Sequence, residues 1–400
     1  MKPRLTLLLG CLLLPTIPAP IPAAAQDRTR PGGDGDVSLK LEIERAVAAG
    51  VEFLEARQDA RTGAWSDPSL PALTALPVSA ILGDPSLDPG APLPDTVEKG
   101  YDFILGHAKP DGGLYDKGLA TYNTALCLMA LVQSGKEEHL PVIAGGRRFL
   151  IDQQQDYGEP GETDNLFDGG IGYGGSYEHS DLSNTHLALE ALHYSQKALA
   201  DTEFDNSDEI DLDWNAAIDF VSRIQNSEKT IEKLGDWVGL REEDRGGFVY
   251  FPGDTKSDEI VLKTDDGEKT ALRSYGSMTY AGLLAFIYAD MDRDDPRIAA
   301  AMDWLRKNFT LEENPGLDAQ GLFYYYHTMS KALAVTGTKE FVTPEGKRVD
   351  WKEELALELM ERQQRDGSWI NPDSNRWMED DPILVTAYAL LALEHVHRAL

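Results

Sequence analysis

Cysteine is scarce in this sequence, with two residues among 400. Cys11 falls in an apolar leader, so Cys127 is the one cysteine expected in the folded domain. A single cysteine cannot form an intrachain disulfide, and the apolar surroundings of Cys127 indicate a buried thiol rather than a nucleophile. Stability must therefore come from a hydrophobic core, which a chain of this length with 42% hydrophobic residues can supply.

Positive charge is also in short supply, because 37 Lys and Arg face 68 Asp and Glu and leave a formal net charge of -31. Such a surface repels nucleic-acid backbones and anionic membranes, so we expect no nucleic-acid partner. Beyond the leader, no stretch reaches transmembrane length without charges. We therefore expect no transmembrane segment in the folded domain.

The first 25 residues differ from the rest of the chain. Lys2 and Arg4 precede an apolar run from Leu5 to Leu14, and small residues up to Ala25 form a cleavage site. This pattern predicts a signal peptide cleaved near Ala25 and export to the periplasm or the outside. The residues before Cys11 also resemble a lipoprotein cleavage site, and this alternative stays open.

A single pattern recurs six times along residues 39–400, after a segment at 26–38 that is rich in Gly, Asp, Arg and Pro and is expected to be flexible. Each repeat has an amphipathic helix, a Gly-rich turn carrying an aromatic residue, and a second, more apolar helix. The second helices are expected at 72–82, 122–134, 183–198, 274–289, 324–336 and 383–395. Helices that are apolar nearly all round must be buried on every side. The sequence therefore predicts an all-α fold, a single α/α toroid of six helix pairs with an inner and an outer ring.

The repeats share further features. A glutamine follows the first helix at one offset in four of them, at Gln58, Gln154, Gln225 and Gln364. The aromatic residues of the turns are expected to plug the gaps between neighbouring pairs. The fourth repeat is swollen by two charged insertions, at 228–245 and 253–269, which we expect to form loops.

Two of these repeats resemble a known family. Phe149-Leu150-x3-Gln154 and Leu359-Met360-x3-Gln364-x2-Gly367-Ser368-Trp369 are similar to the Gln-Trp repeats of squalene and oxidosqualene cyclases, which protein prenyltransferase β-subunits share in looser form. The resemblance covers nearly the whole chain after the leader. It implies an apolar, isoprenoid-like ligand in a central cavity, with the chemistry at the starts of the inner helices. Thioester domains and some polysaccharide lyases also use toroids, so the repeat indicates fold more strongly than activity.

The catalytic signatures of these families are incomplete here. The cyclases use an Asp-x-Asp-Asp acid, and the closest match is Met378-Glu379-Asp380-Asp381, which makes Asp380 and Asp381 catalytic candidates. Asp381 before Pro382 is also typical of an ordinary helix start. Prenyltransferases hold zinc through Asp, Cys and His, and only the segment around His327 resembles that site. We therefore expect no metal and no cofactor.

Polar residues at the starts of the inner helices are expected to converge on the mouth of the cavity. The catalytic candidates among them are His327, Tyr326 and Arg273, beside the two aspartates. The ligand-binding candidates are Tyr122, Asn123, Asp181, Asn184, His186, Tyr275 and Lys331. Helix capping explains Asp181 and Asp381 equally well, whereas it does not call for the histidines, Arg273 or Lys331.

Three functions fit this set of residues. In the first, the cavity binds an isoprenoid or other apolar ligand, with or without terpene cyclase-like catalysis. In the second, Tyr326 or His327 removes a proton beside a uronate carboxylate that Arg273 or Lys331 neutralises, and a polysaccharide is cleaved by β-elimination. In the third, the repeats form a non-catalytic scaffold that binds a protein partner. The family resemblance favours the first.

Overall fold

The computed structural model describes residues 34–400 except 89, 176–178, 206–208 and 266. The signal peptide and the cleavage site expected near Ala25 lie outside these residues. The first helix, α1 (Asp34–Glu55), begins upstream of the expected start at Leu39. The last, α13 (Pro382–Ala399), ends almost at the C-terminus.

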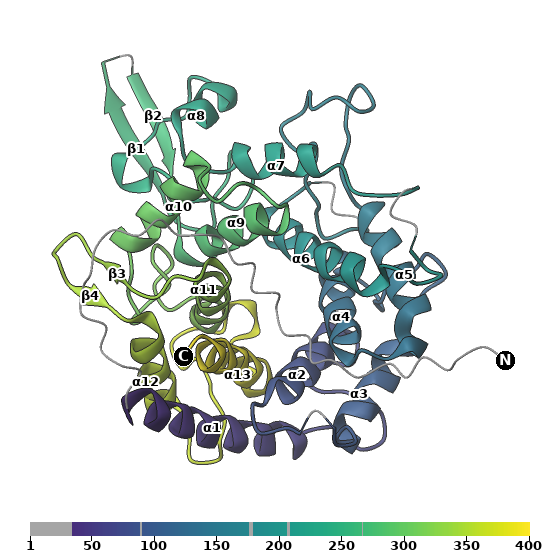
Figure 1. Cartoon of the computed structure of the whole chain (residues 1–400). Coiled ribbons are helices and arrows are strands. Elements are labelled where there is room, and N and C mark those ends of the chain that lie inside the picture. The colour runs from purple at the N-terminus through teal and green to yellow at the C-terminus, as the bar shows by residue number, and fades with distance from the viewer. Residues whose placement is uncertain (1–33, 89, 176–178, 206–208, 266) are drawn as a thin grey trace, which may run out of the picture.

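Helices arranged in two concentric rings form the body of the protein (Figure 1). Each inner helix packs against the next, and α13 returns to α2, so the ring closes. The inner helices are α2 (Ala72–Gly83), α4 (Ala120–Ser134), α6 (Leu182–Leu199), α9 (Gly276–Tyr288), α11 (Leu322–Thr336) and α13. The outer helices are α1, α3 (Asp95–Leu105), α5 (Leu140–Ile151), α7 (Trp214–Arg223), α10 (Pro296–Lys307) and α12 (Trp351–Arg362). The predicted toroid of six helix pairs is confirmed.

The two rings differ in burial as their sequences predict. In α9 every residue from Gly276 to Phe286 is buried, because the helix is covered by both inner neighbours and by the outer ring. In α3 the buried residues recur at helical spacing on one face, from Val97 to Ile104. An apolar stripe covers one side of an outer helix, whereas an inner helix has no side left for water.

The conserved spacing of glutamine and glycine within this chain has a structural cause. Gln154 Nε2 donates to Gly169 O at 3.0 Å and to Asp213 O at 2.9 Å, which ties the turn of the third repeat to the start of α7. At Gly169 φ is +81°, and an added Cβ would lie 2.0 Å from Ala216 O. Only glycine allows that close approach between neighbouring repeats.

Gln58 and Gln225 make the same pair of bonds in their own repeats. In the last repeat the glutamine is Gln363, which donates to Gly367 O and to Ala46 O and so closes the ring onto α1. Gln364, which the sequence places at the same offset as the other three glutamines, does not make these bonds, since its amide donates to Arg362 O. The register is set by Leu359, the buried residue four positions before Gln363.

The insertions of the fourth repeat are more ordered than the expected loops. They contain the helix α8 (Glu228–Leu234), the 3₁₀ turn η2 (Glu242–Asp244) and an antiparallel hairpin of β1 (Glu259–Thr264) and β2 (Gly267–Leu272). A second hairpin joins β3 (Phe341–Val342) to β4 (Arg348–Val349). Two further 3₁₀ turns are η1 (Glu137–His139) and η3 (Arg376–Met378). The two hairpins and α8 extend from the edge of an otherwise helical fold (Figure 1).

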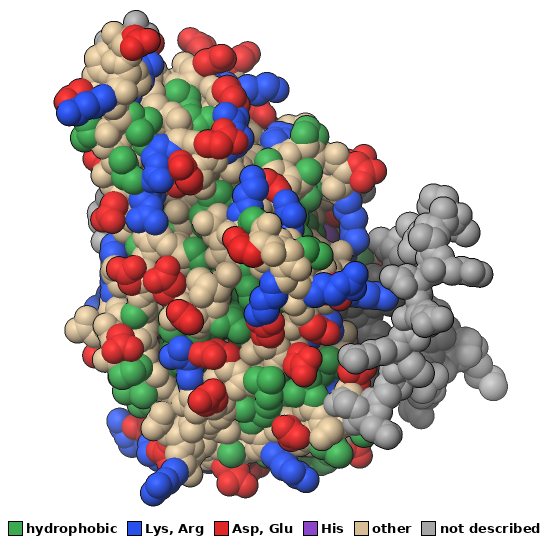
Figure 2. Space-filling view, turned by 90° about the vertical axis from the view of Figure 1, so that its left-hand side faces the viewer, with side chains coloured by type: hydrophobic (Ala, Val, Ile, Leu, Met, Phe, Trp, Pro, Cys, Tyr) green, Lys and Arg blue, Asp and Glu red, His purple; other side chains and the backbone are tan. Residues whose placement is uncertain are grey.

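The surface that carries the hairpins is charged and mixed in sign. Figure 2 shows acidic and basic side chains interspersed over this face, so the net charge is not gathered there into one acidic patch. Among the residues that the structure describes, no helix combines the length and the apolar character needed to cross a bilayer.

Candidate functional site

A cavity of about 260 Å³ lies where the inner helices begin. Tyrosines dominate its wall: Tyr122, Tyr173, Tyr250, Tyr275, Tyr324 and Tyr388. Aliphatic side chains and the turn from Trp377 to Glu379 complete it. Two of the predicted ligand-binding residues, Tyr122 and Tyr275, are thus placed in the cavity wall.

Two phenol groups of the wall pair with each other. Tyr250 Oη donates to Tyr173 Oη at 3.2 Å. Burial raises the pKa of Tyr122 to about 12, so this phenol is uncharged at physiological pH. The wall therefore presents neutral rings, which suit an apolar ligand and the face of a carbocation or an alkene.

Glu379 supplies a carboxyl group to this wall. Its side chain is 1% exposed, and Oε1 accepts from the backbone N–H groups of Phe323 at 3.0 Å and Tyr324 at 2.9 Å. Oε2 accepts from Asn371 Nδ2 at 2.6 Å. Burial raises the pKa of Glu379 to about 7 against the opposing effect of these hydrogen bonds. The group is thus an acid that can hold a proton near neutral pH.

The two aspartates that follow Glu379 do not line the cavity. Asp380 is exposed to solvent. Asp381 caps α13, since Oδ1 accepts from the N–H of Ile383 at 2.9 Å while Oδ2 accepts from Ser66 Oγ. The segment chosen by the Asp-x-Asp-Asp comparison therefore borders the cavity, but of its three acids only Glu379 lines it.

Asp181 is a second buried acid, located on the far side of the tyrosine wall from the cavity. Asp181 is fully buried and caps α6, with Oδ1 accepting from the N–H of Asn184 at 2.9 Å and Oδ2 from its Nδ2 at 2.8 Å. Asp181 also interacts electrostatically with Tyr250, whose side chain lines the cavity. Burial raises the pKa of Asp181 to about 7. Asp181 and Asn184 thus contact the wall from behind rather than the cavity itself.

Asn123 has a structural position. Its Oδ1 accepts from the N–H of Ala72 at 3.0 Å, and its Nδ2 donates to the carbonyls of Gly118 and Leu119. The side chain is fully buried between the starts of α2 and α4. It holds two inner helices in register and is not part of the cavity wall.

The other polar candidates lie farther along the inner helices, in the lumen of the ring. Lys331 Nζ forms an ion pair with both carboxylate oxygens of Glu190, at 2.9 and 3.0 Å. His327 stacks on Tyr388 with ring centroids 5.6 Å apart and approaches His395 at 5.8 Å. Glu190 and Lys331 lie about midway along α6 and α11, His327 lies one turn before Lys331, and His395 lies near the C-terminal end of α13.

The histidines of the lumen are held neutral by burial. Desolvation lowers the pKa of His186 to about 4 and the pKa of His327 well below its ordinary value. His186 Nδ1 lies 2.8 Å from Ser183 O, which makes that nitrogen the donor. Within the described residues, His327 Nδ1 has no hydrogen-bond partner. Neither histidine lines the cavity, and with their lowered pKa values neither carries a proton to donate near neutral pH.

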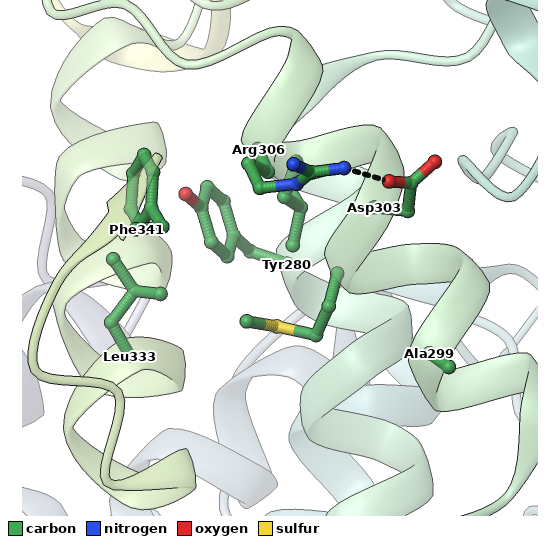
Figure 3. Close-up of a pocket in the computed structure, with 8 residues that line it drawn as sticks. Tyr280, Ala299, Asp303, Arg306, Leu333 and Phe341 are labelled. Carbon is green, nitrogen blue, oxygen red and sulfur yellow. Dashed lines mark hydrogen bonds and ion pairs between the residues drawn. The ribbon is translucent and has the colours of Figure 1, made fainter. Parts of the chain in front are cut away.

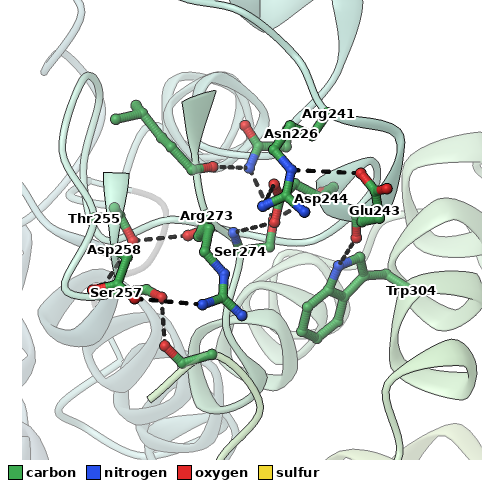
Figure 4. Close-up of polar contacts among 12 residues, drawn as sticks. Asn226, Arg241, Glu243, Asp244, Thr255, Ser257, Asp258, Arg273, Ser274 and Trp304 are labelled. Atoms are coloured by element: carbon green, nitrogen blue, oxygen red, sulfur yellow. Dashed lines mark hydrogen bonds and ion pairs between the residues drawn. The ribbon is translucent and has the colours of Figure 1, made fainter. Parts of the chain in front are cut away.

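Tyr326 and Arg273 are not brought to the cavity. The side chain of Tyr326 is fully buried, and its hydroxyl donates to Leu311 O in the core. Arg273 forms an ion pair with Asp258 at 3.6 Å, and its carbonyl accepts from Thr255 Oγ1 at 2.8 Å (Figure 4). The arginine therefore braces the insertion of the fourth repeat, where Figure 4 shows it beside the network around Asp244.

A second pocket, of about 250 Å³, lies away from the central cavity between α9, α10, α11 and β3 (Figure 3). Tyr280, Leu333 and Phe341 form its apolar wall, and Arg306 pairs with Asp303 at its edge. None of the residues that the sequence singled out lies here. Its position offers an internal control for experiments on the central cavity.

A closed ring of helix pairs around an aromatic cavity is the α/α-toroid fold of type II terpene cyclases. A variant of the type II terpene cyclase MstE from Scytonema, in complex with its product merosterolic acid A, superposes with a TM-score of 0.54 at 13% identity, over 91% of this chain and 99% of that chain. Another variant, in complex with its substrate geranylgeranyl dihydroxybenzoate, gives 0.53 at 12% identity, over 91% and 100% of the two chains.

The predicted resemblance is thus confirmed for the fold, and at these identities it extends no further. Searched against protein-family models and against curated proteins, the chain matches none.

Proposed function

We propose that this protein binds an isoprenoid or another apolar ligand in the tyrosine-lined cavity. The observation that carries the proposal is the cavity wall itself, in which six neutral tyrosine rings and several aliphatic side chains surround about 260 Å³. This volume is close to the lower end of ligand pockets, about 300 Å³. The isoprenoid substrate of MstE, which shares the fold, supports the same class of ligand.

Glu379 is the residue in this cavity that could serve as a catalytic acid. Protonating an alkene requires a carboxylic acid that is kept from water and whose conjugate base is stabilised. Glu379 lines the cavity, is almost fully buried, and receives hydrogen bonds from two backbone N–H groups and Asn371. We infer that it donates a proton to a bound alkene, leaving a carboxylate that those three donors stabilise.

The lyase alternative has no comparable support. It needs a tyrosine or histidine base beside a cation at an open polar cleft. Tyr326 lies in the core, Arg273 pairs with Asp258, and Lys331 pairs with Glu190 in the lumen. His327, the other candidate base, lies near Lys331, but it is buried and that cation is already paired with Glu190, so the two do not meet at an open cleft.

A scaffold role has one observation in its favour. Trp237 and Val261, in the insertion of the fourth repeat, are 49% and 61% exposed. Apolar side chains at an exposed insertion are typical of protein contacts. Removing residues 259–272 and measuring the ligand content of the purified protein separates this role from ligand binding, which we expect to persist.

A matched pair of substitutions tests ligand binding. The chain is expressed, purified and extracted with organic solvent, and the extract is analysed by mass spectrometry. Met278→Trp fills the central cavity, whereas Met302→Trp makes the same change in the outer pocket. We expect a stoichiometric isoprenoid in the wild type and in Met302→Trp and its loss in Met278→Trp. An empty wild type would sink the proposal.

We also propose that the protein is exported. The support is the leader sequence, with Lys2 and Arg4 before the apolar run and Ala25 at the cleavage site. The mass of the secreted chain tests this, because cleavage after Ala25 leaves Gln26 at the N-terminus, whereas lipoprotein processing leaves a lipid on Cys11.

A further inference from the structure

An open polar groove of about 640 Å³ adjoins the same turn that closes the cavity. Gln320 and residues 372–376 line the groove. Trp377 and Met378, the next two residues, line the cavity. The turn η3 therefore has a polar face toward the groove and an apolar face toward the cavity.

The groove holds a cation that no acid neutralises. Arg376 Nη1 donates to the neutral side chain of Gln320, and its guanidinium lies 4.3 Å above the ring of Trp377. Within the described part of the chain, Arg376 forms no ion pair with a carboxylate. Asp373 also lines the groove, but its exposure to water weakens its field.

The backbone of the turn is built to hold Arg376 there. Trp377 and Met378 both have positive φ, +57° and +65°, a conformation that side chains other than glycine rarely adopt. The turn is anchored on both sides, by Arg376 on Gln320 and by Glu379 on the first N–H groups of α11. Two anchors thus hold Trp377 and Met378 in a strained backbone conformation at the edge of a cavity. Such strain indicates that the position of these side chains is functionally constrained.

A second cation approaches the cavity wall from the fourth repeat. Lys256 Nζ lies 4.4 Å from the ring centroid of Tyr250, whose side chain lines the cavity, and 5.5 Å from that of Phe251. Its ion pair with Asp254 is long, at 3.8 Å. Positive charge thus borders the apolar cavity on two of the repeats that form it.

We propose that the ligand is amphiphilic, with an apolar tail in the cavity and a head group of anionic oxygens, a carboxylate or a phosphate, held by Arg376 in the groove. This rests on the proposed function and narrows its ligand class. The planar guanidinium matches two oxygens of either head group, and stacking on Trp377 fixes its plane. A purely hydrocarbon ligand would leave this cation without an anionic partner.

Three C15 ligands that differ only in the head group test the proposal: farnesol, farnesoic acid and farnesyl monophosphate. Dissociation constants are measured by titration calorimetry at pH 8 with the wild type, Arg376→Gln, Arg376→Lys and the control Arg45→Gln on the exposed side of α1. In the wild type we expect at least one anionic ligand to bind about tenfold more tightly than farnesol, as one charge-assisted contact predicts. The tighter of the two anions identifies the head group.

In Arg376→Gln the preference should vanish while the affinity for farnesol stays within about twofold, and Arg376→Lys should keep part of the preference because it keeps the charge. Arg45→Gln should resemble the wild type. Equal binding of all three ligands by the wild type, or a preference that survives Arg376→Gln, would overturn the amphiphile proposal and leave the proposed function standing. Binding of none of the three would overturn both.

Discussion

The two ends of the inner ring are built from the same helices and have opposite chemistry. Along α11, Tyr324 faces the cavity, and His327 and Lys331 follow at the spacing that keeps side chains on one helix face. At the cavity end, Tyr250 donates to Tyr173, and burial raises the pKa of Glu379 and Asp181 to about 7. At the other end a buried ion pair and neutral histidines fill the lumen. One face of α11 thus contributes first to the ligand cavity, through Tyr324, and then to a buried polar cluster, through His327 and Lys331.

The end of the ring that holds the Lys331–Glu190 ion pair should lose more stability when one member of the pair is removed. Lys331→Met leaves Glu190, whose side chain is 5% exposed, buried without its cation. We expect a loss of about 3–5 kcal/mol in the free energy of unfolding, because the uncompensated charge stays in a dry environment. Urea unfolding measures it. The double variant Lys331→Met with Glu190→Gln should recover much of the loss, and a single variant as stable as the wild type would contradict the ion pair's role.

At the cavity end, the effect of removing the acid should be catalytic. Glu379→Gln keeps the shape and the size of the side chain, so the cavity should still retain its ligand. Conversion of a bound alkene should fall by about 10²–10⁴-fold, the usual contribution of a positioned acid. Product formation is followed by mass spectrometry against Asp380→Asn, a neighbouring exposed acid whose loss should change nothing.

The two ends should also respond to pH in opposite directions. His186 has a pKa near 4 when folded and about 6.5 when unfolded, so the unfolded chain binds more protons between these values and stability falls as pH falls through them. Glu379 has a pKa near 7 when folded against 4.5 as its ordinary value, so the folded chain binds more protons there and stability rises on acidification.

Substitutions separate these opposing contributions. Between pH 7 and pH 5, Glu379→Gln should steepen the loss of stability and His186→Asn should flatten it, each by about 1–3 kcal/mol according to the size of the pKa shifts. Thermal unfolding at each pH measures both slopes. The same slope in all three proteins would show that neither group shifts its pKa on folding.

The smallest effect should come from the hydroxyl groups of the cavity wall. Tyr122→Phe removes one phenol hydroxyl group from the cavity wall and leaves the ring in place. We expect a loss of about 1 kcal/mol in stability and no loss of bound ligand. A Tyr122→Phe protein that is purified without ligand would instead show that the hydroxyl groups, and not the aromatic faces, hold it.

The architecture could be read from the sequence because helix burial repeats within the chain. The predicted inner helix at 72–82 is α2 at Ala72–Gly83, and the fully apolar stretch at the end of the chain is α13. The offset shared by the four glutamines is off by one residue in the last repeat, where Gln363 and not Gln364 makes the bonds between repeats. The site was predicted only in part, since Tyr122 and Tyr275 line the cavity whereas Tyr326 turns into the core.

The sequence by itself determined the ring of helix pairs. The hydrophobic period of a helix and the spacing of the repeats are properties of each segment, and they can be recognised without knowing what the segment packs against. Only the tertiary structure decided which of the consecutive acids Glu379, Asp380 and Asp381 faces the cavity. That choice depends on a turn with two left-handed residues and on its contacts with α11, a helix that lies far away in the sequence. The direction of a side chain at a turn depends on the backbone angles and on hydrogen-bond donors from distant segments. A local sequence pattern predicts neither of them.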